Sequence, residues 1–138
     1  MPDRYLIPRV LIIDDTYFQR DRLKLIFQSA GFDIAGEADN GVKGVDLYNK
    51  LLPDLVTMDI NMPYMGGIDA VREIVSKHGD ARIIMVSAMG NPSTIKEAKL
   101  AGALDFAVKP VSSEEFLSKV RKILESSFPD FYSESNSK

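Results

Sequence analysis

Five side chains that could do chemistry stand where short apolar runs end. The runs are 10–13, 55–58, 83–86 and 106–108, and the residues that follow them are Asp14 and Asp15, Asp59, Ser87 and Lys109. Clustered carboxylates repel one another, so such a set is favourable mainly around a hard dication, and Mg²⁺ takes carboxylate oxygens as ligands. A hydroxyl donor and a compact lysine cation add groups that suit a phosphoryl group. The pattern indicates a site for Mg²⁺ and a phosphoryl group.

The apolar runs alternate with longer segments in which apolar residues recur at helical spacing, which is typical of βαβ units and a parallel sheet. Residues 10–13 lack polar alternation, as expected of a strand buried on both faces, and a weaker run at 32–38 supplies a fifth strand. With right-handed crossovers, the sequence predicts an α/β fold: a doubly wound, five-stranded parallel sheet with helices on both faces. Ligands bind outside the carboxyl ends of such strands, so the five side chains would share one cleft.

Five helices are expected between and after these strands. Apolar residues at helical spacing mark the first two: Phe18, Leu23, Ile26, Phe27 and Ala30, then Val42, Val45, Tyr48 and Leu52. Gly31 suits the end of the first helix, and Asn40-Gly41 suits the start of the second. Asn91-Pro92 and Ser112-Ser-Glu-Glu115 are start signals for the fourth and fifth helices.

Length and composition favour one domain. The chain has 138 residues, of which 45% are hydrophobic, and these can form one sizeable core. The domain is expected over residues 9–126, with an N-terminal extension at 1–8. A polar tail at 127–138 is expected to be mostly frayed apart from Phe128, Phe131 and Tyr132.

Several function classes are disfavoured by the same composition. The formal net charge of −3 argues against general electrostatic binding to nucleic acid. No apolar stretch approaches the roughly 18 residues that span a bilayer, so no membrane insertion is expected. Without cysteine there is no disulfide framework or thiolate metal site, and the single histidine leaves little for a zinc site. The N-terminus lacks the features of a signal peptide, so a cytoplasmic location is expected.

Taken singly, the motifs have ordinary interpretations: Asp14-Asp15 could be a solvated strand end, Asp59 a turn residue and Ser87 a helix cap. Together, and in this order at the strand ends, they resemble the receiver domain of bacterial two-component response regulators. The motifs are Asp14-Asp15, Asp59-Ile-Asn61-Met-Pro63, Ser87-Ala88, Ala101-Gly-Ala103 and Lys109-Pro110. The resemblance covers roughly residues 9–125 and implies a flavodoxin-like (βα)5 fold.

The resemblance also implies a role for each site residue. Asp59 would be the phosphoacceptor, because a carboxylate can attack phosphorus and form an aspartyl-phosphate. Asp15 and Asp59 would bind Mg²⁺ directly with the backbone carbonyl of Asn61, and Asp14 would act mostly through water. Lys109 would pair with Asp59 at rest and with a phosphoryl oxygen afterwards.

A conformational switch is implied as well. Ser87 would donate a hydrogen bond to the phosphoryl group, and Phe106 would rotate inward into the space that Ser87 vacates. A cis peptide bond is expected before Pro110. Three positions depart from the common pattern. Phe106 lacks the hydroxyl of the tyrosine that is frequent there, and Gly66 leaves the third helix without a side-chain cap. Met89 puts an apolar group near the expected approach of water. The target surface would be formed by residues 92–124.

The leading hypothesis is a stand-alone response regulator of chemotaxis type. It would take a phosphoryl group from a sensor histidine kinase and bind a target such as the flagellar switch, as a monomer or a weak phosphorylation-dependent dimer. It would catalyse its own phosphorylation and dephosphorylation, without turnover of other substrates. One alternative is a phosphorelay carrier that feeds a histidine phosphotransfer protein, and another is a flavodoxin-like small-molecule binder. An aspartyl phosphatase is disfavoured because Asn61 stands where a general acid would be needed.

Overall fold

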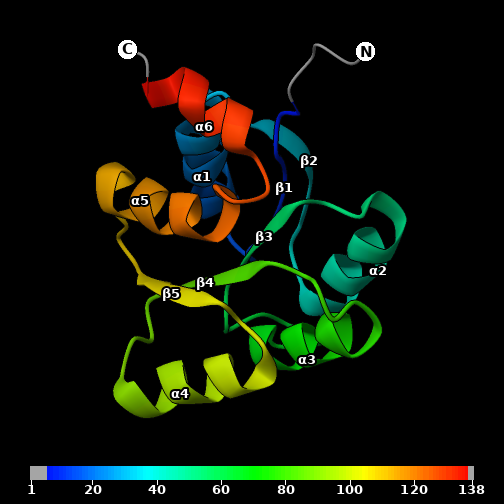
Figure 1. The fold of residues 1–138 in the computed structure, drawn as a ribbon. Helices are drawn as coiled ribbons and strands as arrows, with labels where there is room; N and C mark the ends of the chain where they lie inside the picture. Colours follow the sequence, from blue (N-terminus) through cyan, green and yellow to red (C-terminus); the bar gives the residue numbers. More distant parts are fainter. Residues whose placement is uncertain (1–5, 137–138) are drawn as a thin grey trace.

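The computed structural model of the chain describes residues 6–136 (Figure 1). Five strands and six helices lie in this range. The strands are β1 (Arg9–Ile13), β2 (Asp33–Ala38), β3 (Leu55–Met58), β4 (Ile83–Ser87) and β5 (Asp105–Val108). The helices are α1 (Tyr17–Ser29), α2 (Gly41–Leu51), α3 (Gly67–Lys77), α4 (Pro92–Ala101), α5 (Ser113–Leu124) and α6 (Pro129–Asn136). The predicted strands are confirmed to within one residue at their starts.

All five strands pair in parallel in one sheet, in the order β2-β1-β3-β4-β5. The strand order reverses between β1 and β3, and ligands of open α/β sheets bind at such a switch point. Ile13 of β1 pairs with Met58 of β3, so the two strands end level with each other. The residues that follow, Asp14 and Asp59, therefore emerge side by side.

Helices cover both faces of the sheet, which confirms the predicted doubly wound architecture. Figure 1 shows α1 and α5 on one face and α2, α3 and α4 on the other. Each face has its own apolar cluster, one around Ile12, Phe27 and Phe116 and the other around Met58, Val71 and Met85. The expected start signals are present: Asn40 and Asn91 accept hydrogen bonds from the backbone N–H groups of Lys43 and Thr94.

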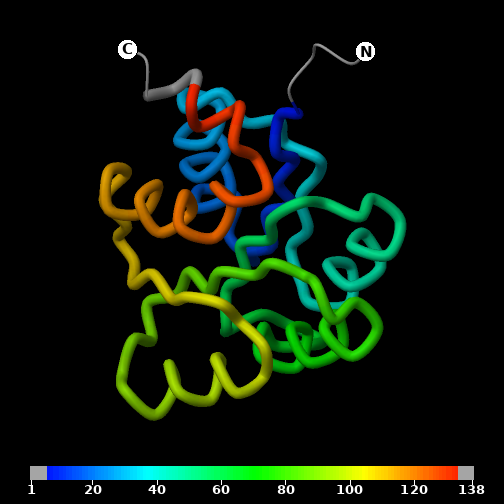
Figure 2. The backbone as a smooth tube through the Cα atoms, viewed as in Figure 1, coloured from blue at the N-terminus to red at the C-terminus, as the bar shows by residue number. Residues whose placement is uncertain are grey.

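The C-terminal segment differs from its prediction as a mostly frayed tail. Residues Pro129–Asn136 form helix α6, which follows α5 and lies against α1 (Figure 2). Phe128, Phe131 and Tyr132 are buried in the same apolar cluster as Phe27, and Phe131 packs edge-on against Phe32 at 5.1 Å between ring centroids. These aromatic contacts give the short segment enough apolar burial to form a helix. Residues 137–138 lie outside the described range.

Three residues assigned to helical core faces are instead exposed. Phe18 is 72% exposed, because the five residues to Leu23 span about 1.4 turns and place the two side chains on different sides of α1. Val42 is exposed in the first turn of α2. Leu52 is exposed because it caps α2 in the left-handed region, at φ 46°, and so leaves the helical path.

None of the helices in residues 6–136 combines the length and the apolar character needed to cross a membrane.

Candidate metal and phosphorylation site

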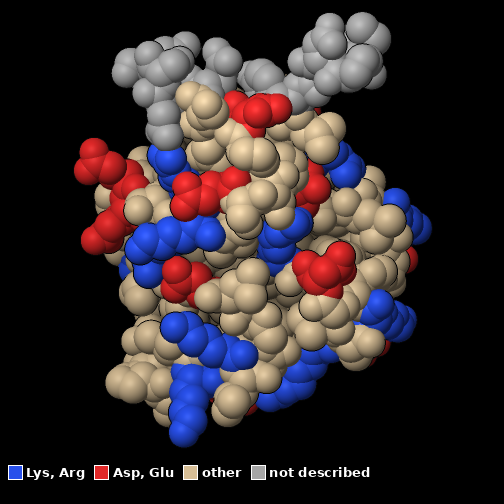
Figure 3. Space-filling model, in the orientation of Figure 1, with Lys and Arg blue, Asp and Glu red and all other residues tan. Residues whose placement is uncertain are grey.

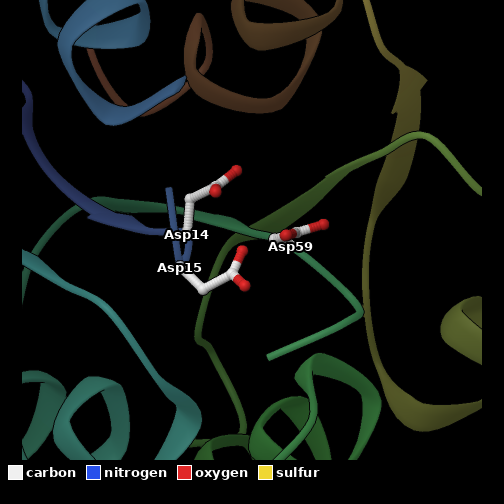
Figure 4. Close-up of side chains that lie close together, drawn as sticks. All are labelled: Asp14, Asp15 and Asp59. Carbon is white, nitrogen blue, oxygen red and sulfur yellow. The ribbon is translucent and has the colours of Figure 1, made fainter. Parts of the chain in front are cut away.

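Three carboxylates meet at the switch point of the sheet. Asp14 and Asp15 follow β1 and Asp59 follows β3, and one carboxylate oxygen of each lies within 4.8 Å of the others. Figure 4 shows the three side chains projecting from neighbouring strand ends toward the same space. Asp14 is 1% and Asp59 6% exposed, whereas Asp15 is exposed. The three aspartates singled out from the sequence are thus brought together.

Asp14 is held from several directions. Its Oδ1 accepts hydrogen bonds from the backbone N–H of Thr16 at 2.9 Å and from the Thr16 hydroxyl at 3.0 Å. Its Oδ2 accepts a hydrogen bond from Lys109 Nζ at 2.7 Å, and its backbone N–H donates to the carbonyl of Ala38 at 3.0 Å. Asp14 is therefore fixed both by its side chain and by the edge of the sheet.

Lys109 lies between two of the carboxylates. Its Nζ is 2.7 Å from Oδ2 of Asp14 and 3.5 Å from Oδ2 of Asp59. The expected pairing with Asp59 is present, but the hydrogen bond goes to Asp14. The backbone of Lys109 is anchored by a hydrogen bond to the carbonyl of Ser87, and the peptide bond before Pro110 is cis, as expected from the resemblance.

Asp59 carries uncompensated negative charge. Burial and, next, the charge of Asp14 raise the pKa of the Asp59 carboxyl from 3.8 to about 6, against the opposing effects of Lys109 and of the Ile60 backbone N–H. That N–H donates to Asp59 Oδ1 at 2.8 Å. The cluster thus holds three carboxylates, and Lys109 pairs with two of them, so a further positive charge would be stabilised here.

The loop after β3 packs closely beneath Asp59. A Cβ atom on Gly67 would lie 1.8 Å from the carbonyl oxygen of Asp59, so only glycine fits at this position. The Gly67 N–H donates to the carbonyl of Ile60 at 2.8 Å, and Gly66 begins α3 without a side-chain cap, as the sequence indicated. The Asn61 amide donates to Met89 Sδ at 2.9 Å, so the Met89 thioether lies against the loop that follows Asp59.

Ser87 is the last residue of β4, and Phe106 lies on the neighbouring strand β5. Both are buried, and the Ser87 hydroxyl accepts a hydrogen bond from the backbone N–H of Met89 at 3.2 Å. The Phe106 ring belongs to the apolar cluster on the α3 and α4 face. The two residues thus stand at the strand positions expected for the switch, with Phe106 already turned into the core.

Sequence reasoning missed Thr16 and Arg20. The Asp14-Asp-Thr16 turn has a local signal, because aspartate side chains often accept a hydrogen bond from the backbone two residues on. Arg20 donates to the carbonyl of Asp14 at 2.8 Å and to Glu37 Oε1 at 2.8 Å. That contact joins α1, β1 and β2, and no local pattern indicates it.

The donor set fits Mg²⁺. Hard carboxylate oxygens from one or two residues, completed by waters and phosphate oxygens, are the usual ligands of Mg²⁺ in proteins. Burial and, next, the negative charge of Asp14 raise the pKa of Asp59, and a dication bound here would favour the ionised carboxylate. Softer metals are disfavoured, because neither the chain's single histidine nor any cysteine belongs to the cluster.

Fold and site together define a class of signalling protein. The family model described as the response regulator receiver domain matches residues 10–121, and the chain belongs to that family. Phosphorylation on an aspartate and dependence on Mg²⁺ are general features of the family. The chain is 49% identical over 115 residues to the chemotaxis protein CheY of Thermotoga maritima, covering 83% of this chain and 96% of the relative. It is 47% identical over 116 residues to the CheY of Bacillus subtilis, covering 84% and 97%. These relatives mark it as a response regulator of chemotaxis type.

Solved structures agree with this assignment. A chain of the CheX–CheY–BeF3–Mg complex from Borrelia burgdorferi superposes with a TM-score of 0.83 at 38% identity, covering 85% of this chain and 90% of that one. The response regulator domain of Thermotoga maritima CheB superposes with a TM-score of 0.78, also at 38% identity, covering 86% and 96%.

Proposed function

We propose that Asp59 accepts a phosphoryl group from the phosphohistidine of a sensor histidine kinase. A carboxylate oxygen of Asp59 forms a bond to phosphorus while the bond from phosphorus to the histidine nitrogen breaks, leaving an aspartyl-phosphate and a free imidazole. The observation that carries the proposal is the convergence of Asp14, Asp15 and Asp59 within 4.8 Å, with Lys109 3.5 Å from Asp59.

The neighbouring residues prepare this transfer. Asp15, Asp59 and the backbone carbonyl of Asn61 would hold Mg²⁺, with Asp14 acting through water. The ion, when bound, neutralises charge on the phosphoryl oxygens, which is the main need of such a reaction. Lys109 then donates to a phosphoryl oxygen, since its ammonium already lies beside Asp59.

The conformational readout would use Ser87 and Phe106. The Ser87 hydroxyl donates to a phosphoryl oxygen once that group is present, and it gives up its contact with the Met89 N–H. Phe106 is buried against the α4 side of the sheet, so a shift of Ser87 biases the packing of the ring and of α4. Residues 92–124 would carry this change to a partner.

The expected partner is a protein. Leu100, Leu104 and Val108 are large apolar side chains exposed on α4 and around β5, within the proposed target surface. Acidic and basic side chains are interspersed over the middle of the face shown in Figure 3, in keeping with the net charge of −3 and with a protein rather than nucleic acid as partner. Candidates are the flagellar switch and, by analogy with the CheX–CheY complex, a CheX-like protein. The chain would work in the cytoplasm as a monomer or a weak phosphorylation-dependent dimer.

Intact mass after incubation with Mg²⁺ and a small phosphodonor tests the phosphoacceptor. We expect one added phosphoryl group, which is lost in Asp59→Asn and when the metal is chelated. Asp69→Asn is the matched control, because this aspartate is exposed on α3 and should leave the modification unchanged. Modification of Asp59→Asn to the wild-type level would contradict the assignment.

A second experiment separates the alternatives. The phosphorylated chain is incubated with a purified histidine phosphotransfer protein and, separately, with a flagellar switch protein. Rapid loss of the phosphoryl group to the former would favour the phosphorelay carrier, whereas phosphorylation-dependent binding of the latter supports the chemotaxis regulator. A flavodoxin-like small-molecule binder is disfavoured by the acidic cluster.

A further inference from the structure

Arg20 bridges the acidic site and the edge of the sheet. From the first turns of α1, its Nη1 donates to the backbone carbonyl of Asp14 at 2.8 Å and its Nε donates to Glu37 Oε1 on β2, also at 2.8 Å. The side chain is largely buried, and the Tyr17 ring lies 5.8 Å from its Cζ. A guanidinium is planar and rigid, so two simultaneous contacts fix its orientation.

The carbonyl that Arg20 holds belongs to the peptide bond between Asp14 and Asp15. The Asp14 side chain has its own partners, Thr16 and Lys109. No residue in the described range 6–136 donates a hydrogen bond to the carboxylate of Asp15, so the direction of this side chain depends on its backbone. By holding the peptide group, Arg20 determines where the Asp15 carboxylate points within the cluster.

Glu37 in turn fixes Arg20. Its Oε1 accepts from Arg20, and its Oε2 accepts from Lys24 Nζ at 2.7 Å. Hydrogen bonds from Lys24 and then Arg20 lower the pKa of Glu37, so this carboxylate is ionised at neutral pH and the bridge persists. Lys24 pairs with the same carboxylate but has no contact with Asp14.

We propose that Arg20 is a positioning residue for the metal site: it orients the Asp15 carboxylate through the Asp14 carbonyl, with Glu37 as its anchor. The inference rests on the proposed function, in which Asp15 is a ligand of Mg²⁺. Partners that orient metal ligands commonly change metal affinity by about 10- to 100-fold when they are removed.

The test compares Arg20→Gln with Lys24→Gln. Each variant removes one ion pair with Glu37, but only the first frees the Asp14 carbonyl. Calorimetric titration of each unphosphorylated protein with Mg²⁺ should give a Kd raised about tenfold in Arg20→Gln and close to the wild-type value in Lys24→Gln. Urea unfolding in chelator shows whether the two variants lose similar stability.

A phosphorylation measurement distinguishes positioning from chemistry. Because Arg20 acts on metal binding alone, Arg20→Gln should need about tenfold more Mg²⁺ for half-maximal modification of Asp59 and should regain the wild-type maximal rate when saturated. A lower maximal rate at saturating Mg²⁺ would contradict the proposal.

Three other results would contradict the role of Arg20 or the proposed function. Equal Mg²⁺ affinities in the two variants would overturn the inference and leave Arg20 as a structural ion pair. If Arg20→Gln does not fold, Glu37→Gln replaces it: removal of the anchor should weaken Mg²⁺ binding, and an unchanged affinity would contradict the bridge. Failure of the wild-type chain to bind Mg²⁺ would instead refute the proposed function itself.

Discussion

The ammonium group of Lys109 lies 2.7 Å from Oδ2 of Asp14, closer than the 3.5 Å that separates it from Asp59. Both carboxylates are almost fully buried, so this single cation must serve two charges in a region of low polarity. Because Lys109 is bonded to Asp14, Asp59 keeps a share of uncompensated charge. Burial of the Asp59 carboxyl and, next, the negative charge of Asp14 raise its pKa despite the nearby cation.

Replacing Lys109 tests this arrangement. Lys109→Met should lower the free energy of unfolding at pH 8 by about 3 kcal/mol, because removing one partner of a buried ion pair leaves its charge unpaired. Lys119→Met is a suitable comparison, since Lys119 pairs with Asp105 at 3.5 Å in a more exposed position and should cost at most about 1 kcal/mol. Urea unfolding in chelator measures both, and equal losses would contradict a buried pair at Asp14.

The pH dependence of stability should show the raised pKa of Asp59. The folded chain binds the proton of the Asp59 carboxyl more tightly than the unfolded chain does. Protonation of Asp59 therefore stabilises the fold fully below about pH 4, and this stabilisation is lost as the pH rises through about 6. In Asp59→Asn, the side chain at position 59 carries no charge at any pH. Without metal it should exceed the wild type in stability by up to about 3 kcal/mol at pH 7.5, since two pKa units correspond to about that much.

The same comparison at low pH provides the control. Near pH 3.5 the wild-type Asp59 is mostly protonated in both folded and unfolded chains, so the difference between Asp59→Asn and the wild type should nearly vanish. Urea midpoints from pH 3.5 to 8 measure the trend. If the difference in stability between Asp59→Asn and the wild type does not change with pH, the charge of Asp59 does not cause that difference.

Met89 should lengthen the lifetime of the phosphorylated state. Its sulfur accepts a hydrogen bond from the Asn61 amide at 2.9 Å, so the thioether lies against the loop that follows Asp59. Met89→Ala would open a path for water and, by lowering the hydrolysis barrier by about 1 kcal/mol, shorten the lifetime about fivefold. Met89→Leu keeps the apolar bulk and should retain the lifetime. Decay of the phosphorylated mass after removal of the donor measures this, and an unchanged decay in Met89→Ala would refute the shielding role.

Helix α6 should contribute to the stability of the whole domain. Phe131 is 8% exposed and packs against both Phe32 and Tyr132, so Phe131→Ala should lower the free energy of unfolding by about 3 kcal/mol. Phe18→Ala makes the same chemical change at a residue that is exposed on α1, and it should cost less than about 0.5 kcal/mol. Similar losses in the two variants, measured by urea unfolding, would show that α6 does not belong to the core.

Much of the fold and of the candidate site could be predicted from local sequence. The buried strands appear as uninterrupted apolar runs, and the residue after each run falls at the carboxyl edge of a parallel sheet. That rule alone brought Asp14, Asp59 and Lys109 to one place, and the structure places them there. Asn40, Asn91 and Gly31 were predictable in the same way, because helix caps depend on a few neighbouring residues.

Other features needed contacts between distant parts of the chain. The hydrogen bond from Lys109 to Asp14 joins residues 95 positions apart, and its preference over Asp59 depends on how β1, β3 and β5 align. Helix α6 packs against Phe32, and the side chain of Arg20 is held by Glu37. No local sequence pattern links either pair of partners. The sequence by itself determined the strands, the helix ends and the chemical groups of the site. Only the tertiary structure decided which charges pair and which aromatic side chains are buried, because both depend on distances across the folded chain.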